Sequence, residues 1–157
     1  MGRYEESITD FSKALEIGPD AVNVLLGRGK TYEQMGRYDE SITDFNRALE
    51  IEPNNVNILS TRGLSYFRMG KYEESIADLS KALEIKPDDV EMLLGRGKNY
   101  LKMGRYDESI ANLNRALEIE PNNENVLVTR GDVYCIIGKY KESIADLSRA
   151  LEIEHEK

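Results

Sequence analysis

The chain has 157 residues, of which 40% are apolar and 32% are charged, and its 21 basic and 29 acidic side chains give a formal charge of −8. This acidic excess disfavours a nucleic-acid-binding surface, because binding to phosphates depends on a basic excess that releases counterions. The balance of apolar and charged residues also excludes a membrane-spanning protein and a disordered chain. We therefore expect a folded chain that binds neither nucleic acid nor a membrane.

Cysteine and histidine are too scarce for most of the chemistry that they support. The chain has one of each, Cys135 and His155, so we expect neither an internal disulfide nor a zinc site of the usual Cys/His kind. A catalytic cysteine–histidine pair would require these two residues to meet. The N-terminal sequence MGRYEESITD has no apolar stretch after a basic start, which predicts no secretory signal. We expect a cytoplasmic setting, no metal and no cofactor.

The sequence repeats itself every 34 residues. The motif Met-Gly-Arg-Tyr at Met1 returns at Met35 and Met103, and close variants of it start at Met69 and Ile137. A longer period of 68 is also present, because residues 22–55 share 26 of 34 positions with residues 90–123 but only 18 with residues 56–89. A fixed period of this length is typical of repeat proteins, in which each repeat is one small structural unit.

Taken in chain order, the sequence predicts a single array of helix pairs. Residues 1–21 form a lone second helix, and four full units follow it at residues 22–55, 56–89, 90–123 and 124–157. Apolar residues recur at intervals of three and four, as in Ile42, Phe45 and Leu49, which indicates helices rather than strands. We expect nine helices joined by tight turns, one from residues 1–21 and two from each full unit.

Glycine and proline are predicted to divide the helices. A glycine of the kind that ends a helix in the left-handed conformation lies in the middle of each unit, namely Gly36, Gly70, Gly104 and Gly138. A proline, which biases the preceding residue away from helix, separates successive units, namely Pro19, Pro53, Pro87 and Pro121. We expect the Asx residue after each proline to accept from the first free amides of the next helix; these residues are Asp20, Asn54, Asp88 and Asn122.

Small residues recur on both helices of a unit. Each full unit has a glycine inside its first helix, where glycine costs about 1 kcal/mol relative to alanine. Its second helix has a serine and an alanine seven residues apart, and so on one face. We infer that these residues let the two backbones approach closely. The structural set comprises Gly29, Gly63, Gly97, Gly131, Ala48, Ala82, Ala116 and Ala150, together with Pro53, Pro87 and Pro121.

The repeat resembles the tetratricopeptide repeat (TPR), a 34-residue helix–turn–helix unit with the signature aromatic-x2-Leu-Gly-x2-Tyr, then Ala-x3-Phe, then Pro. The matching residues in the first full unit are Leu25, Arg28, Gly29, Tyr32, Ser41, Phe45 and Pro53. Leucine replaces the aromatic residue and arginine the usual leucine. The resemblance implies an all-α fold, a right-handed α-α superhelix of antiparallel helix pairs, with first helices on the concave side and no catalytic activity.

The recurring arginine of the first helix has two interpretations. Arg28, Arg62, Arg96 and Arg130 could form a ladder for an acidic ligand. Alternatively, each could pair with an acidic residue at one equivalent place on the second helices, at Asp10, Asp44, Asp78 and Asp146, with Asn112 as the exception. We favour the second interpretation.

The first-helix residues that packing does not require are the candidate contacts for a protein or peptide ligand in the concave groove. They include Asn23, Leu26, Lys30, Asn57, Thr61, Leu64, Phe67, Arg68, Leu94, Lys98, Leu101, Lys102, Asn125 and Val128. All first-helix positions of this kind carry four positive and three negative side chains, +1 in total, which leaves −9 for the rest of the chain. This difference favours a ligand with apolar anchors and one or two carboxylates over a strongly acidic ligand.

Other functions are less favoured by the sequence. Gly29-Lys30-Thr31 ends like a phosphate-binding loop but lacks the required glycine at Val24 and a preceding strand. The lysines and asparagines with which some TPR proteins clamp the tails of heat-shock chaperones are missing, because residues such as Leu26, Ser60, Leu94 and Val128 stand in their places. The main alternative to a ligand-binding groove is a self-assembling repeat, or a fragment of a longer array, that associates end to end through uncapped terminal helices.

Overall fold

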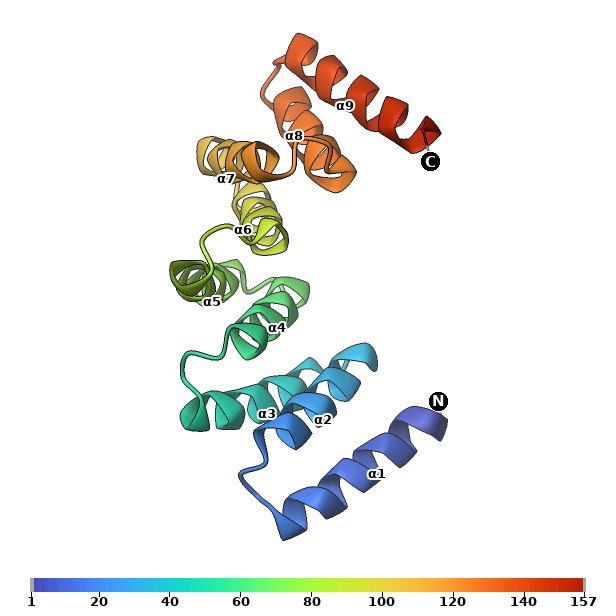
Figure 1. The fold of residues 1–157 in the computed structure, drawn as a ribbon, viewed down its shortest axis with the longest axis vertical. Helices are drawn as coiled ribbons and strands as arrows, with labels where there is room; N and C mark the ends of the chain where they lie inside the picture. Colours follow the sequence, from blue (N-terminus) through green and yellow to red (C-terminus); the bar gives the residue numbers. More distant parts are fainter. Residues whose placement is uncertain (1, 157) are drawn as a thin grey trace. The chain divides into compact units, whose positions relative to one another are not determined.

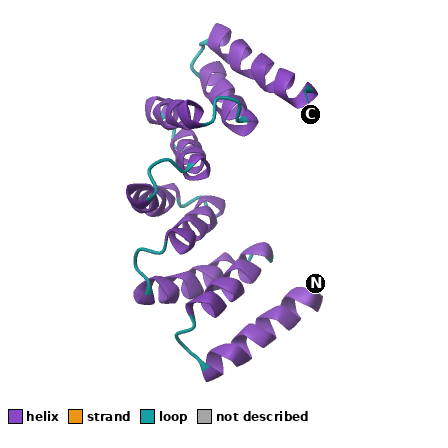
Figure 2. Cartoon of the chain, viewed as in Figure 1, coloured by secondary structure: helices purple, strands orange, loops and turns teal. Residues whose placement is uncertain are grey.

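The computed structural model describes residues 2–156, and all regular structure within that range is helical (Figures 1 and 2). The nine helices of this range are α1 (Gly2–Ile17), α2 (Val22–Gln34), α3 (Tyr38–Ile51), α4 (Val56–Arg68), α5 (Tyr72–Ile85), α6 (Val90–Lys102), α7 (Tyr106–Ile119), α8 (Glu124–Ile136) and α9 (Tyr140–His155). The predicted all-α fold of consecutive antiparallel pairs is confirmed. Helix α1 matches the second helices in sequence, and four helix pairs follow it in the described range.

The turn inside each repeat is built on a left-handed glycine, as the sequence predicts. Gly36, Gly70, Gly104 and Gly138 have φ angles of 74°, 73°, 72° and 80°, and no other residue in the described range has a positive φ. The left-handed glycine reverses the direction of the chain, so the amide of the residue after it can donate to a carbonyl in the last turn of the preceding helix. For example, the amide of Arg37 donates to the carbonyl of Tyr32 at 2.8 Å, which is the long bond of a Schellman motif.

The turn between repeats differs from the prediction by one residue. The N-cap side chains belong to Asn55, Asp89 and Asn123, which accept from the amides three positions ahead. Ala21, at the equivalent place before α2, has no capping side chain. The caps were wrongly placed because both residues after each later proline are Asx types, and the capping bond requires the extended residue that directly precedes the helix.

The residues that follow the prolines have a different role. Arg115 Nη2 donates to Asp88 Oδ1 at 2.5 Å, and Arg149 Nη2 donates to Asn122 Oδ1 at 3.0 Å. Arg47 reaches the matching Asp20 at 3.4 Å. A basic residue near the end of each of these second helices thus binds the turn that precedes its repeat. These contacts are exposed, so each contributes little to stability.

Within each repeat the two helices touch through the glycine of the first helix. A Cβ atom added at Gly29 would lie 2.5 Å from Cε1 of Phe45, and one added at Gly131 would lie 2.9 Å from Cγ of Leu147. The alanines of the second helices fill the same layer, since Ala48, Ala82 and Ala116 are 0% exposed. The inferred close approach of two backbones is therefore mainly a contact between the glycine and a side chain of the second helix, and this packing offsets the low helix propensity of glycine.

The described helices form two compact units, which we treat separately. The first ends at Ile85 and contains α1 to α5, and the second starts at Lys86 and contains α6 to α9. In the first unit each helix packs on its neighbour in sequence, and α2 also contacts α4. In the second unit α6 contacts α8 in the same way. Whether the whole chain acts as a single array stays a prediction.

Candidate functional site

One arginine in a repeat can hold three helices together. Arg28 on α2 donates from Nε and Nη2 to the two carboxylate oxygens of Asp44 on α3, at 2.8 and 2.6 Å. Its remaining nitrogen, Nη1, donates to Ser12 Oγ on α1 at 3.0 Å. The first two bonds lie within one repeat, and the third reaches the preceding second helix. We call this arrangement the arginine bridge.

The arginine bridge recurs in both units. Arg62 binds Asp78 on α5 through two nitrogens and Asn46 on α3 through Nη1, at 2.7 Å. Arg130 likewise binds Asp146 on α9 and, at 2.7 Å, Asn114 on α7. In the remaining repeat the acid is replaced by an amide, and Arg96 Nε donates to Asn112 Oδ1 at 2.8 Å.

These arginines are structural. The side chains of Asp44, Asp78 and Asp146 are only 5%, 7% and 9% exposed, while those of their arginines are 20–21% exposed. Hydrogen bonding to the aspartates raises the pKa of Arg28, Arg62 and Arg130, despite a smaller opposing effect of burial. The pairing interpretation of the sequence therefore holds for these three arginines, which are engaged within the fold rather than presented as a ladder to an acidic ligand. It does not hold for Asp10, which is exposed and to which no arginine of the described range is bound.

In the first unit the predicted contact residues lie on two touching helices, α2 and α4. Leu64 is 43% exposed, and Asn23, Asn57 and Arg68 are also exposed. The other predicted residues here are half-buried, namely Leu26, Lys30, Thr61 and Phe67. Thr61 is turned back to its own helix, because its hydroxyl donates to the carbonyl of Asn57 at 2.7 Å.

One ion pair on this surface was not predicted. Glu33 on α2 has a side chain only 9% exposed, and its Oε1 lies 2.6 Å from Nη1 of Arg68 on α4. The signal available in the sequence was the neighbouring repeats, which carry Phe67, Leu101 and Cys135 at the place of Glu33. An acid at such a mostly apolar position needs a partner to remain charged. Arg68 is thus partly committed to α2.

In the second unit the corresponding surface belongs to α6 and α8. Lys102, Asn125 and Val128 are exposed, with Val128 at 38%. Lys98 and Leu101 are half-buried. Leu94 differs from the rest of the predicted set, because it is 4% exposed and offers little surface to a ligand. We call the exposed and half-buried members of the set the first-helix surface of each unit, which lies on α2 with α4 in the first unit and on α6 with α8 in the second.

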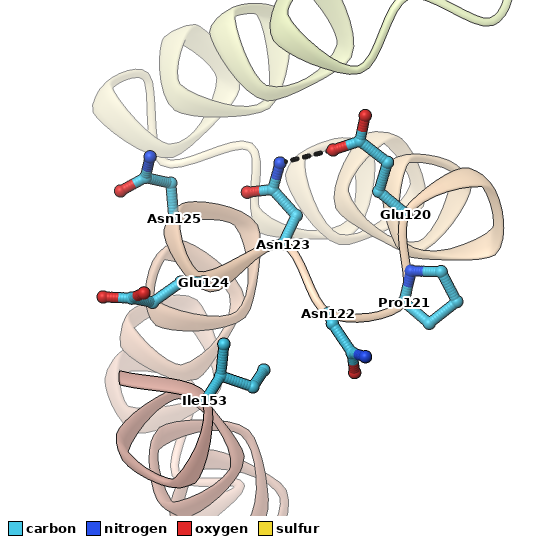
Figure 3. Close-up of a pocket in the computed structure, with 7 residues that line it drawn as sticks. All are labelled: Glu120, Pro121, Asn122, Asn123, Glu124, Asn125 and Ile153. Atoms are coloured by element: carbon cyan, nitrogen blue, oxygen red, sulfur yellow. Dashed lines mark hydrogen bonds between the residues drawn. The ribbon is translucent and has the colours of Figure 1, made fainter. Parts of the chain in front are cut away.

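A polar hollow lies beside this surface in the second unit (Figure 3). It is lined by Glu120, Pro121, Asn122, Asn123, Glu124, Asn125 and Ile153. Asn123 donates to Glu120 at 2.7 Å (Figure 3) and also accepts from the amide of Val126, so both bonds of its side-chain amide stabilise the turn and the start of α8. Within residues 2–156, no three His, Cys, Asp or Glu side chains are grouped so that they could hold a metal ion.

Comparison with known proteins identifies the class. A family model described as TPR repeat matches residues 1–36, 34–70, 63–104 and 97–135, and the chain belongs to the TPR repeat family. No curated protein matches the chain. The fold suggests protein partners and is typically non-catalytic. None of the described helices has the length and apolar character needed to cross a bilayer.

Among solved structures the chain is similar to MamA. A crystal structure of MamA has 22% identity to the chain and a TM-score of 0.92, covering 99% of this chain and 91% of MamA. MamA MSR-1 has 25% identity and a TM-score of 0.85, covering 99% and 89%. MamA AMB-1 has 26% identity and a TM-score of 0.82, covering 98% and 84%. At these levels the likeness establishes the fold.

The arginine bridge predicts an asymmetry between two variants. Asp78→Ala should lower the free energy of unfolding by about 3 kcal/mol, because it leaves a largely buried guanidinium without its carboxylate. The double variant Arg62→Leu with Asp78→Leu should lose about 1 kcal/mol or less, because it removes both charges together. Urea denaturation of both variants would measure this difference. Equal losses would contradict the paired, buried role of these residues.

Proposed function

We propose that the chain is a non-catalytic scaffold that binds an extended peptide or a partner helix on its first-helix surface, the predicted concave groove. This proposal rests on apolar residues of the first helices that are exposed instead of packed in the core. Leu64 and Val128 are 43% and 38% exposed on first helices, although their neighbours Leu59 and Leu127 are buried in the core. Each unit thus exposes an apolar side chain on its first helices, and such exposed apolar side chains favour association with a partner.

The charges around these apolar residues indicate the ligand chemistry. Lys30 and Lys98 are half-buried and Lys102 is exposed, and no hydrogen bond or ion pair within residues 2–156 engages their ammonium groups. The chain as a whole carries −8. A ligand with apolar anchors and one or two carboxylates would satisfy these lysines, whereas the net charge would repel a strongly acidic one.

The same features argue against other roles. The net negative charge disfavours nucleic acid as a partner. The charged residues recur at positions on helix surfaces or in the arginine bridges, so no catalytic group is needed to explain them. We infer a cytoplasmic setting, supported by a lone cysteine, Cys135, that is exposed and unpaired by any disulfide.

An affinity capture with two matched variants tests the groove. Leu64→Ser with Phe67→Ser alters the first-helix surface, and Tyr140→Ser with Ile144→Ser likewise replaces one aromatic and one aliphatic residue on α9. The proposal would be supported by a partner that the unmodified chain and the α9 variant capture equally, and that the first-helix variant captures in at least about tenfold lower amount. Equal capture by all three proteins, or selective loss with the α9 variant, would contradict it.

Self-association through the terminal helices is the alternative, and α9 provides the observation that favours it. Tyr140, Ile144 and Leu151 on this helix are 64%, 64% and 56% exposed. The equivalents of Ile144 in the three preceding repeats, Ile42, Ile76 and Ile110, are half-buried. Sedimentation velocity at several concentrations would show a shift to larger species that Ile144→Glu abolishes. A monomer at every concentration would exclude this alternative.

A further inference from the structure

Arg68 on α4 differs from the arginines of the arginine bridges in how many of its donors the fold uses. Arg62 is fully engaged, because its Nε and Nη2 bind Asp78 and its Nη1 binds Asn46. Arg68 uses only Nη1, which donates to Glu33 Oε1 on α2 at 2.6 Å. Its Nε and Nη2 make no hydrogen bond with any residue of the described range. We call these two nitrogens the open edge of Arg68.

The contact with Glu33 holds the open edge in a defined direction. The side chain of Glu33 is only 9% exposed, whereas that of Arg68 is 44% exposed. The largely buried acid thus fixes one nitrogen of a rigid, planar group, and the position of the other two nitrogens follows. A hydrogen bond between two charged groups is about twice as strong as one between neutral groups. Glu33 therefore orients Arg68 before any ligand binds.

An exposed apolar side chain lies next to Arg68 on α4. Leu64 is four residues earlier, and so on the same face of the helix, and it is 43% exposed. The two Cα atoms are about 6 Å apart along the helix axis, at a rise of about 1.5 Å per residue. In an extended peptide, side chains two residues apart point to the same side and are separated by about 6.6 Å. Two such side chains of one ligand can therefore contact Leu64 and Arg68 together.

The donors of the open edge and the local charge define the ligand group that Arg68 accepts. Nε and Nη2 both donate, and their spacing in the planar group matches the two oxygens of a carboxylate. The charges of Lys30, Glu33 and Arg68 sum to +1, which balances one carboxylate, while the −8 of the whole chain disfavours a multiply charged anion. The equivalent places in the second unit hold Leu101 and Ile136, so this ion pair is confined to the first unit.

We propose that the first-helix surface of the first unit selects an extended peptide in which one residue separates an aliphatic residue from a glutamate or aspartate. The aliphatic side chain contacts Leu64, and the carboxylate binds the open edge of Arg68, which Glu33 holds in place. This ligand chemistry rests on the proposed function, because it concerns the same surface. A helical ligand is disfavoured, since a short helix is marginal alone in water and a ligand with two contacts would lose much of its affinity to folding.

Selection of random peptides displayed on phage, with the full chain as the target, tests this proposal. Each peptide is fused to the coat protein through its C-terminus, so its carboxylates are those of side chains. Enriched peptides should carry an acid two residues from an aliphatic residue. In synthetic copies with an amidated C-terminus, a change of that acid to its amide should weaken binding about tenfold, as expected for the loss of a hydrogen bond between charged groups.

Three variants of the chain assign this effect to its residues. With Arg68→Gln, the change of acid to amide in the peptide should alter the affinity by less than about twofold, because the donors that bind the carboxylate are gone. Arg47→Gln removes the same charge from an arginine of α3 that is 50% exposed, and the full effect should remain. With Glu33→Leu, selection should still enrich acids, but at variable distances from the aliphatic residue, because the guanidinium is no longer held.

A fourth variant, Leu64→Ser, separates a failure of this inference from a failure of the proposed function. The inference alone is overturned if peptides lose binding with Leu64→Ser but carry no acid at the stated spacing, or if the effect of the acid survives Arg68→Gln. A spacing of three or four residues would indicate a helical ligand, and a spacing unchanged by Glu33→Leu would exclude the role of Glu33; both contradict the proposal. No enriched peptides, or binding that Leu64→Ser does not weaken, would contradict the proposed function as well.

Discussion

The arginine bridge is the interaction that recurs in both units and joins each of these repeats to the second helix that precedes it. Helix pairs in a repeat protein contact only their neighbours, so stability is the sum of terms within repeats and terms between them. The guanidinium of Arg62 contributes to both: two of its nitrogens bind Asp78 inside the repeat, and the third binds Asn46 in the preceding one. A leucine at this place, as in the usual TPR signature, could pack but could not form the directed bond to Asn46.

The bridge also explains why the candidate binding surface has little basic character. A row of arginines on the first helices suggests a strongly positive binding site for an acidic ligand. Three of the four arginines, however, are bound to buried carboxylates. Their charge is neutralised inside the repeats, and Arg68 is partly neutralised by Glu33. Apart from the open edge of Arg68, the cations left for a ligand are lysines, which are flexible, strongly hydrated point charges. Such a surface suits a ligand whose affinity comes from apolar anchors.

Much of the fold could be predicted because each signal lies within one repeat and recurs in the others. The glycines of the inner turns, the helix pairs and the pairing of arginine with aspartate all follow from spacing. The N-caps were misplaced because the capping bond depends on backbone angles, which the Asx pair Asn54-Asn55 does not reveal. The bonds from Arg62 to Asn46 and from Arg68 to Glu33 join different repeats, and their geometry depends on how neighbouring repeats pack. Spacing also did not distinguish Leu94, which is 4% exposed, from Val128 at the same place in the next repeat, which is 38% exposed.

Native-state hydrogen exchange on the variant Arg62→Leu with Asp78→Leu tests the central claim most directly. In the unmodified chain the amides of α3 and α5 should share one opening free energy, because the arginine bridge couples their repeats. In the variant the pair α4 and α5 should stay folded while its opening free energy separates from that of α3. Identical opening free energies for α3 and α5 in both proteins would contradict the claim that this arginine couples successive repeats.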